Sequence, residues 1–183
     1  VVVVIIEPYS TEPVKHFIGK AEELLGPSSG APPRADGHKC VNFFAQPLED
    51  FNPEPGRYDV IWIQWCVGHL TDEDFVSFFK RCAVGLKPGG MIMLKENNAK
   101  DGFVLDTDDS SLTRSHKYLM WLFEEALGYE VVKHRLQKNF PTELFQVRMY
   151  AVKPTKTTTT EQRLMRPRLR WKKMRRRHSR SYP

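Results

Sequence analysis

The fold is decided by the stretch Tyr58-Asp-Val-Ile-Trp-Ile-Gln-Trp-Cys-Val-Gly-His-Leu-Thr71, followed by Leu86-Lys-Pro-Gly-Gly90 and Met91-Ile-Met-Leu-Lys-Glu-Asn97. Val60–Ile63 is a short apolar run with β-branched and aromatic members, which is typical of a strand covered on both faces. Thr71 with Asp74 predicts a helix start, and Pro88-Gly89-Gly90 predicts the end of that helix. Met91–Leu94 then predicts a second buried strand, parallel to the first.

Polar side chains stand at the ends of both strands. Gln64, Trp65 and His69 fall at or just beyond the end of the first, and Lys95-Glu-Asn97 follows the second. Parallel strands end at the same edge of a sheet, and open α/β sheets bind their ligands at that edge. These side chains are therefore candidates for a site.

The rest of the chain supplies the other elements of one domain. Strands are predicted at Val1–Ile6, Val41–Phe44, Glu130–Arg135 and Leu144–Val152, and helices at Val14–Leu25 and Ser115–Leu127. In the helix Val14–Leu25, the apolar Phe17, Ala21 and Leu24 share one side. With 183 residues, 40% of them hydrophobic, the chain can bury one sizeable core.

Two segments suit the parts of a nucleotide. A carboxylate that follows an early strand can accept hydrogen bonds from both hydroxyls of a ribose, and either Glu7 or Glu12 is in position to do so. Leu48-Glu-Asp-Phe51 follows the strand 41–44, where its backbone groups can meet an adenine ring. No strand with a GxGxG loop precedes these acids. We therefore expect a chain that is incomplete at its amino terminus, without the first strand and the Gly-rich loop.

The net charge of +6 comes from a basic tail. Residues 161–183 hold ten Lys or Arg and one Glu, so the rest of the chain has a net charge of −3. Because the tail has too few apolar residues to fold alone, we predict a domain at 1–154 and a basic tail at 155–183. The tail has three interpretations: a solvated extension, a nuclear import signal or a weak nucleic-acid arm.

Cysteine spacing and hydropathy exclude other classes. Cys40, Cys66 and Cys82 form no CxxC pair, which argues against a disulfide framework and a zinc site, so we expect reduced, buried thiols and no metal. Val1–Ile6 is far shorter than the roughly 20 residues that cross a bilayer, and no membrane partner is expected. We expect a cytoplasmic protein, with a nuclear fraction if the tail is an import signal.

Three blocks of the chain carry a closer resemblance: Asp59-Val-Ile-Trp-Ile-Gln-Trp-Cys-Val-Gly-His-Leu-Thr-Asp72, Lys95-Glu-Asn-Asn98 and Leu105-Asp-Thr-Asp-Asp-Ser-Ser-Leu-Thr-Arg114. They resemble the eukaryotic alpha-N-terminal protein methyltransferases, which modify proteins beginning Xaa-Pro-Lys. The resemblance implies a Rossmann-like α/β fold with a mostly parallel, seven-stranded type sheet, and S-adenosyl-L-methionine as cofactor. It also implies cofactor contacts at Glu12, Leu48, Glu49 and Gln64. Glu12 fits better than Glu7 because it keeps the family's spacing to the aromatic residue of the next helix.

The resemblance assigns the substrate side to six residues: Trp65, His69, Asn97, Asp106, Asp109 and Ser111. A terminal amine has a pKa near 8, so at neutral pH it must lose a proton before it can attack the methyl group of the sulfonium. The resemblance implies Asp109 and His69 as the base, directly or through a water. Trp65 would face the second-position proline.

The other three residues would hold the peptide and the catalytic groups. Asn97 would hydrogen-bond the peptide backbone, Asp106 would receive the third-position lysine, and Ser111 would hold Asp106 or Asp109 in place. Ordinary structural roles exist as well. Trp65 alone is typical of a core, His69 of a helix cap or a surface, Asp106 and Asp109 of a turn, and Gln64 of a strand end.

We predict an enzyme that transfers methyl groups from S-adenosyl-L-methionine to the alpha-amino group of proteins with free Xaa-Pro-Lys amino termini. The alternative is a catalytically inactive, methyltransferase-like interaction protein that binds Pro-Lys amino termini or an intact relative. A third interpretation makes the basic tail a nucleic-acid arm, but no folded nucleic-acid reader accompanies the tail, so we expect no nucleic-acid partner. The number of methyl groups added stays open.

Overall fold

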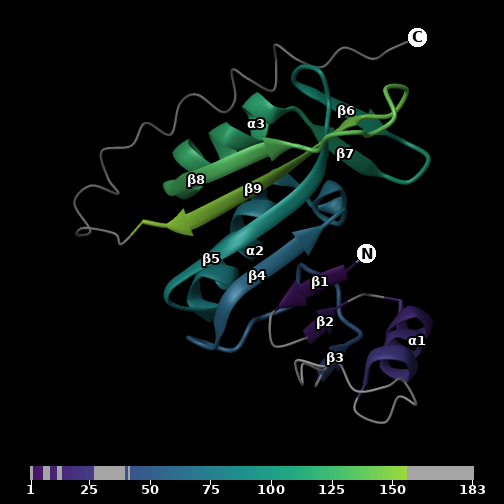
Figure 1. The fold of residues 1–183 in the computed structure, drawn as a ribbon, viewed down its shortest axis with the longest axis vertical. Coiled ribbons are helices and arrows are strands. Elements are labelled where there is room, and N and C mark those ends of the chain that lie inside the picture. Colours follow the sequence, from purple (N-terminus) through teal and green to yellow (C-terminus); the bar gives the residue numbers. More distant parts are fainter. Residues whose placement is uncertain (1, 6–8, 12–13, 27–39, 41, 156–183) are drawn as a thin grey trace.

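The computed structural model describes residues 2–5, 9–11, 14–26, 40 and 42–155. A seven-stranded sheet in the order β3-β2-β1-β4-β5-β9-β8 forms its centre (Figure 1). Its strands are β1 (Val2–Ile5), β2 (Tyr9–Thr11), β3 (Asn42–Phe44), β4 (Tyr58–Gln64), β5 (Leu86–Asn98), β8 (Tyr129–Leu136) and β9 (Gln146–Pro154). A separate hairpin consists of β6 (Phe103–Asp106) and β7 (Ser111–Arg114). The helices are α1 (Lys15–Leu25), the 3₁₀ turn η1 (Val67–His69), α2 (Asp72–Gly85), α3 (His116–Trp121) and its π-helical continuation η2 (Leu122–Leu127).

Five strands of this sheet share one direction, which confirms the predicted α/β architecture. β2 pairs with β3 in parallel, and β4 pairs with β5 in parallel. β1 is antiparallel to both β2 and β4, so β2, β3, β4 and β5 run the same way, and β8 joins them across the antiparallel β9. The carboxyl ends of β2 to β5 therefore meet at one edge of the sheet.

The strand predicted at Val1–Ile6 lies in the sheet, but against the direction of its neighbours. β1 occupies the place between β2 and β4, where Val2 pairs with Gln64. Only residues 6–8 separate β1 from β2. A parallel pairing requires a crossover of about a dozen residues or more, so this short connection forces an antiparallel pair.

The core lies between the sheet and the helices that cover one face of it (Figure 1). Ile61 and Ile63 of β4 and Ile92 of β5 are fully buried against the phenylalanines of α2. Phe75 stacks on Phe79 at 4.3 Å between ring centroids. The predicted cover on both faces of β4 is uneven, because Val60, Trp62 and Gln64 on its other face are half-buried.

Helix α2 begins as predicted and ends earlier than predicted. The Thr71 hydroxyl caps it by accepting the Asp74 N–H at 3.1 Å. The helix ends at Gly85, where a Cβ would stand 2.6 Å from Pro53 Cβ, so only glycine lets the helix end pack against that loop. The Pro88-Gly89-Gly90 segment instead forms a bulge at the start of β5, between the pairings of Tyr58 and Val60 with that strand.

Other predicted elements differ in detail. In α1 the buried residue is Ile18, while Phe17 and Leu24 are exposed, so the predicted apolar side of this helix is wrong. The hairpin β6–β7 is an element that periodicity alone did not predict. Cys40, Cys66 and Cys82 are buried and form no disulfide, as expected. Within 14–26 and 42–155, no helix has the length and apolar character that a membrane crossing requires. The tail from residue 156 onward lies outside the described residues.

Candidate active site

Trp65 marks the point where β4 ends at the carboxyl edge of the sheet. Its φ of 53° is in the left-handed region, which costs free energy for a bulky side chain. The Trp65 N–H donates to the Lys95 carbonyl at 3.1 Å, and the Lys95 ammonium lies 4.8 Å from the centroid of the indole ring. With 41% of its surface exposed, Trp65 is not a core residue. The turn presents the ring at the rim of the sheet.

Gln64 precedes this turn and is half-buried. Its side-chain oxygen accepts the indole N–H of Trp62 at 3.1 Å, since both residues point to the same face of β4. The side-chain amide nitrogen of Gln64 is thereby oriented away from Trp62. Gln64 thus ends the strand with a side chain that Trp62 holds in place. This position is compatible with the predicted cofactor contact and with the purely structural role of a polar strand end.

Arg81 of α2 fixes the segment that follows β3. Its guanidinium donates to the carbonyl oxygens of Leu48 at 2.7 Å, Glu49 at 2.9 Å and Phe51 at 3.0 Å. Leu48 is buried and Glu49 is exposed. Among the described residues, the backbone N–H groups of Leu48 and Glu49 donate to no protein acceptor. The segment therefore offers free N–H donors on a backbone that is held from behind.

The hairpin β6–β7 carries the predicted acidic residues on its turn. Asp106 accepts the N–H of Asp108 at 2.9 Å, and Asp109 accepts the N–H of Ser111 at 2.9 Å. These two bonds are the local bonds expected of turn residues. Ser110, between Asp109 and Ser111, has a φ of 59°. The sequence left open whether Ser111 holds Asp106 or Asp109, and the structure shows that it bonds Asp109.

Asp109 and His69 lie close enough to interact electrostatically. The Ser111 hydroxyl holds the pKa of Asp109 below its ordinary value, and the charge of His69 lowers it further. Both side chains are exposed. At neutral pH the Asp109 carboxyl is therefore ionised, which is the state that accepts a proton or a hydrogen bond from an ammonium group.

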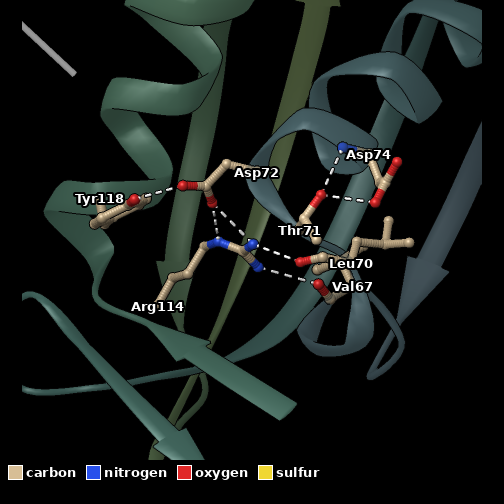
Figure 2. Close-up of polar contacts among 7 residues, drawn as sticks. All are labelled: Val67, Leu70, Thr71, Asp72, Asp74, Arg114 and Tyr118. Atoms are coloured by element: carbon tan, nitrogen blue, oxygen red, sulfur yellow. Dashed lines mark hydrogen bonds and ion pairs between the residues drawn. The ribbon is translucent and has the colours of Figure 1, made fainter. Parts of the chain in front are cut away.

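A buried ion pair joins the hairpin to the segment that carries His69 (Figure 2). Arg114, at the end of β7, is 2% exposed and contacts Asp72 Oδ1 at 2.9 Å through both Nε and Nη2. Its Nη1 and Nη2 also donate to the carbonyls of Val67 at 3.1 Å and Leu70 at 2.7 Å. The Tyr118 hydroxyl donates to Asp72 Oδ2 at 2.6 Å. Every polar atom of this pair is thus used.

β5 contributes Glu96 and Asn97 to the same edge. Glu96 is buried, and its Oε1 accepts the N–H of Asn97 at 2.9 Å. Burial raises the pKa of the Glu96 carboxyl to about 7. The backbone N–H groups of Asn97 and Val67 favour the carboxylate and so lower this pKa, but by less than burial raises it. Asn97 is half-buried beside it. Glu96 therefore titrates near neutral pH at the base of the candidate site.

The raised pKa of Glu96 predicts a pH-dependent stability. A carboxyl with a higher pKa in the folded state stabilises the fold below the unfolded pKa, and this stabilisation is lost as pH rises to about 7. The free energy of unfolding of Glu96→Gln, relative to the natural chain, should therefore rise by up to ~3 kcal/mol between pH 5 and pH 8. Urea unfolding at both pH values measures it, with Glu143→Gln, at an exposed carboxyl, as control. A constant difference for Glu96→Gln would show that Glu96 is ionised throughout.

The structure brings most of the predicted site residues to one edge. Gln64 ends β4, and Trp65 and His69 follow it. Asn97 is the last residue but one of β5, and Asp106, Asp109 and Ser111 lie on the hairpin. Leu48 and Glu49 follow β3 on the other side of β1. Glu12 lies outside the described residues. Sequence reasoning missed four residues that hold these segments in place: Asp72, Arg81, Arg114 and Tyr118.

Comparison with curated proteins gives a consistent family. Residues 7–153 match the family described as AdoMet dependent proline di-methyltransferase. The chain is 52% identical over 141 residues to alpha N-terminal protein methyltransferase 1 of Arabidopsis thaliana, covering 77% of this chain and 49% of the relative. It is 39% identical over 137 residues to N-terminal Xaa-Pro-Lys N-methyltransferase 1 of Mus musculus, covering 75% and 57%. The chain thus spans about half the length of the curated relatives that it matches.

Solved structures give the same fold. A SAM-dependent methyltransferase from Leishmania major has a TM-score of 0.69 at 41% identity, over 79% of this chain and 54% of that one. The 1,6-didemethyltoxoflavin-N1-methyltransferase of Burkholderia thailandensis has a TM-score of 0.60 at 14% identity, over 80% and 60%. At that identity the second likeness shows the fold alone. Together they confirm the predicted Rossmann-like methyltransferase fold.

Proposed function

The chain belongs to the AdoMet-dependent proline di-methyltransferase family, and from this premise we propose that it methylates the alpha-amino group of proteins beginning Xaa-Pro-Lys. The observation that carries the proposal is the meeting of two segments at one sheet edge. The turn that holds His69 packs against the strand that follows Asp109, and the charge of His69 acts on the Asp109 carboxyl. The names of the relatives from Arabidopsis thaliana and Mus musculus support the substrate class.

The residues of the β3 and β4 ends fit the cofactor. The free N–H groups of Leu48 and Glu49 suit the ring nitrogens of adenine, and Gln64 offers an oriented amide at the neighbouring strand end. When bound, S-adenosyl-L-methionine supplies the methyl group on a positively charged sulfur. We propose Glu12 for the ribose hydroxyls, because a carboxylate can accept hydrogen bonds from both of them and Glu12 follows β2 in the sequence.

The hairpin and the β4 turn fit the substrate amine. The ionised Asp109 attracts the ammonium group and accepts its proton together with His69, directly or through a water, which frees the lone pair for attack. We assign Trp65 to the ring of the second-position proline, because its indole is exposed at the rim. Asn97 is assigned to the peptide backbone and the exposed Asp106 to the third-position lysine.

The direct test is mass spectrometry of a peptide beginning Ser-Pro-Lys, incubated with the chain and S-adenosyl-L-methionine. Mass steps of one methyl group are expected on the free peptide, and none on the same peptide with a blocked amine. If neither peptide gains mass, the proposal is wrong for this chain. Transfer to both peptides would move the acceptor from the amino terminus to the lysine side chain.

We place the protein in the cytoplasm with a nuclear fraction, and we assign the basic residues 161–183 to import rather than to nucleic-acid binding. What supports this is their composition of ten Lys or Arg with one Glu. A fluorescent fusion with and without residues 161–183 tests it. Equal nuclear signal from both fusions would remove the import role.

Arg81 predicts a binding effect separable from chemistry. Arg81→Met removes three hydrogen bonds to the backbone at 48–51, so the Kd for S-adenosylhomocysteine should rise by about tenfold, measured by calorimetry. Hydrogen exchange at the amides of Asp50 and Phe51, which donate to the Pro47 carbonyl, should speed up at the same time. Lys80→Met, at the exposed neighbouring position, is the control. Unchanged exchange at these two amides would show that Arg81 does not hold this segment.

A further inference from the structure

Arg114 hydrogen-bonds the backbone both before and after His69 in the chain. The carbonyls that accept from its guanidinium belong to Val67 and Leu70, and His69 lies between them in the chain (Figure 2). A three-residue 3₁₀ turn such as η1 has few internal bonds of its own, so its position depends on outside partners. Here those partners are the donors of one buried side chain, fixed in a planar fork.

The backbone of Arg114 is anchored as firmly as its side chain. Its carbonyl accepts the N–H of Ala99 at 3.3 Å and the side-chain amide of buried Asn98 at 3.2 Å. Asn98 in turn accepts the hydroxyl of Tyr150 at 2.9 Å, which ties β7 to the central sheet. Three residues before Arg114 along the same strand, Ser111 holds Asp109. Arg114 thus belongs rigidly to the segment that carries Asp109.

The turn η1 also packs directly against this strand. The Cβ position of Gly68 lies 3.7 Å from Ser111 Cβ and 3.7 Å from the Leu112 carbonyl oxygen. Residues 43 and 44 positions apart in the chain are therefore neighbours, next to the two residues whose charges interact, His69 and Asp109. A shift of η1 along β7 would change the separation of these two side chains.

We propose that Arg114 is a positioning residue that sets the separation of His69 and Asp109 by bonding both carbonyls that flank His69. The inference rests on the proposed function, in which these two side chains share the proton of the amine. Arg114 touches neither the substrate nor the cofactor in this assignment. Its effect on turnover passes through the placement of the two exposed groups.

Arg114→Lys separates positioning from folding. Lysine keeps a positive charge beside Asp72, so the carboxylate does not become a buried unpaired charge. Its single ammonium cannot reproduce the fork that reaches Asp72, Val67 and Leu70 together. With η1 released, kcat for the Ser-Pro-Lys peptide should fall by about 10–100-fold, because small misplacements of catalytic groups have effects of this size.

A double-mutant cycle with Asp109→Asn gives the decisive comparison. If Arg114 acts by placing the pair, Arg114→Lys should lower kcat strongly in the natural chain and by less than about threefold in the Asp109→Asn background. A residue that only maintains the fold lowers kcat by the same factor in both backgrounds, and that result would overturn the proposal. Cys82→Ala, at a buried position of α2 outside this network, is the control for general destabilisation.

A second measurement holds even for a chain without methyl transfer, so failure of the proposed function stays distinguishable. The pKa of Asp109 can be followed by NMR of its carboxyl carbon. Because the charge of His69 lowers this pKa, His69→Gln should raise it in the natural chain. In the Arg114→Lys background, His69→Gln should leave it unchanged. An equal rise in both backgrounds would show that Arg114 does not set the separation.

Discussion

Asp109→Asn should lower kcat by about 10²–10⁴-fold on a Ser-Pro-Lys peptide, with the Kd of the cofactor within about twofold of its original value. The asparagine keeps the shape of the turn, since its side-chain oxygen can still accept the Ser111 N–H. It removes the negative charge that attracts the ammonium group and accepts its proton. Single-turnover kinetics, with cofactor binding by calorimetry, separates the two effects.

Two further variants test the interpretation of this result. Asp108→Asn removes a carboxylate from the same exposed turn and should leave kcat unchanged, so it controls for loss of general negative charge. Gln64→Ala should raise the Kd of the cofactor, because it removes the oriented amide at the end of β4. If Asp109→Asn and Gln64→Ala weaken cofactor binding equally, the division of the edge into a cofactor side and a substrate side is wrong.

Asp72→Ala should lower the free energy of unfolding by about 3–5 kcal/mol, because it leaves Arg114 as an unpaired charge in the interior. The pair is 2% and 4% exposed, so water cannot take the place of the lost carboxylate without opening the packing. Tyr118 loses its acceptor at the same time. Urea unfolding followed by circular dichroism measures the change.

The matched control is Asp59→Ala. Asp59 pairs with Lys87 at 2.7 Å, but the two side chains are 66% and 46% exposed, so the loss should stay below about 1 kcal/mol. Equal losses for Asp72→Ala and Asp59→Ala would contradict the account, since burial is the feature that separates the two pairs.

Much of the fold follows from local patterns. The cap of α2 at Thr71 was predicted because the hydroxyl and the N–H that it bonds are three residues apart. The strand at Val60–Ile63 and the left-handed Gly128 that closes η2 are equally local signals. The hairpin β6–β7 was harder, since Leu105-Asp-Thr-Asp-Asp-Ser-Ser-Leu-Thr-Arg114 predicts a turn but lacks the alternation that marks strands.

The candidate site likewise has a part that local sequence predicts and a part that it does not. The polar residues at the ends of β4 and β5 were predicted because strand direction alone brings strand ends together. The apolar side of α1 was predicted wrongly, with Ile18 buried in place of Phe17, because which side of a short helix meets the sheet depends on the neighbouring elements. Arg81 gave no signal, as its three carbonyl partners lie 30 to 33 residues away.

The sequence by itself determined the long strands and helices, the family and the residue types at the sheet edge, because periodicity, caps and motifs are written in neighbouring residues. The tertiary structure alone decided that β1 runs against its neighbours and that Arg114 is buried between two turns. Its bonds to Asp72, Leu70 and Val67 join residues 42, 44 and 47 positions apart. A charged side chain is read from sequence as exposed, and only the packing of distant segments can supply the partners that let it be buried.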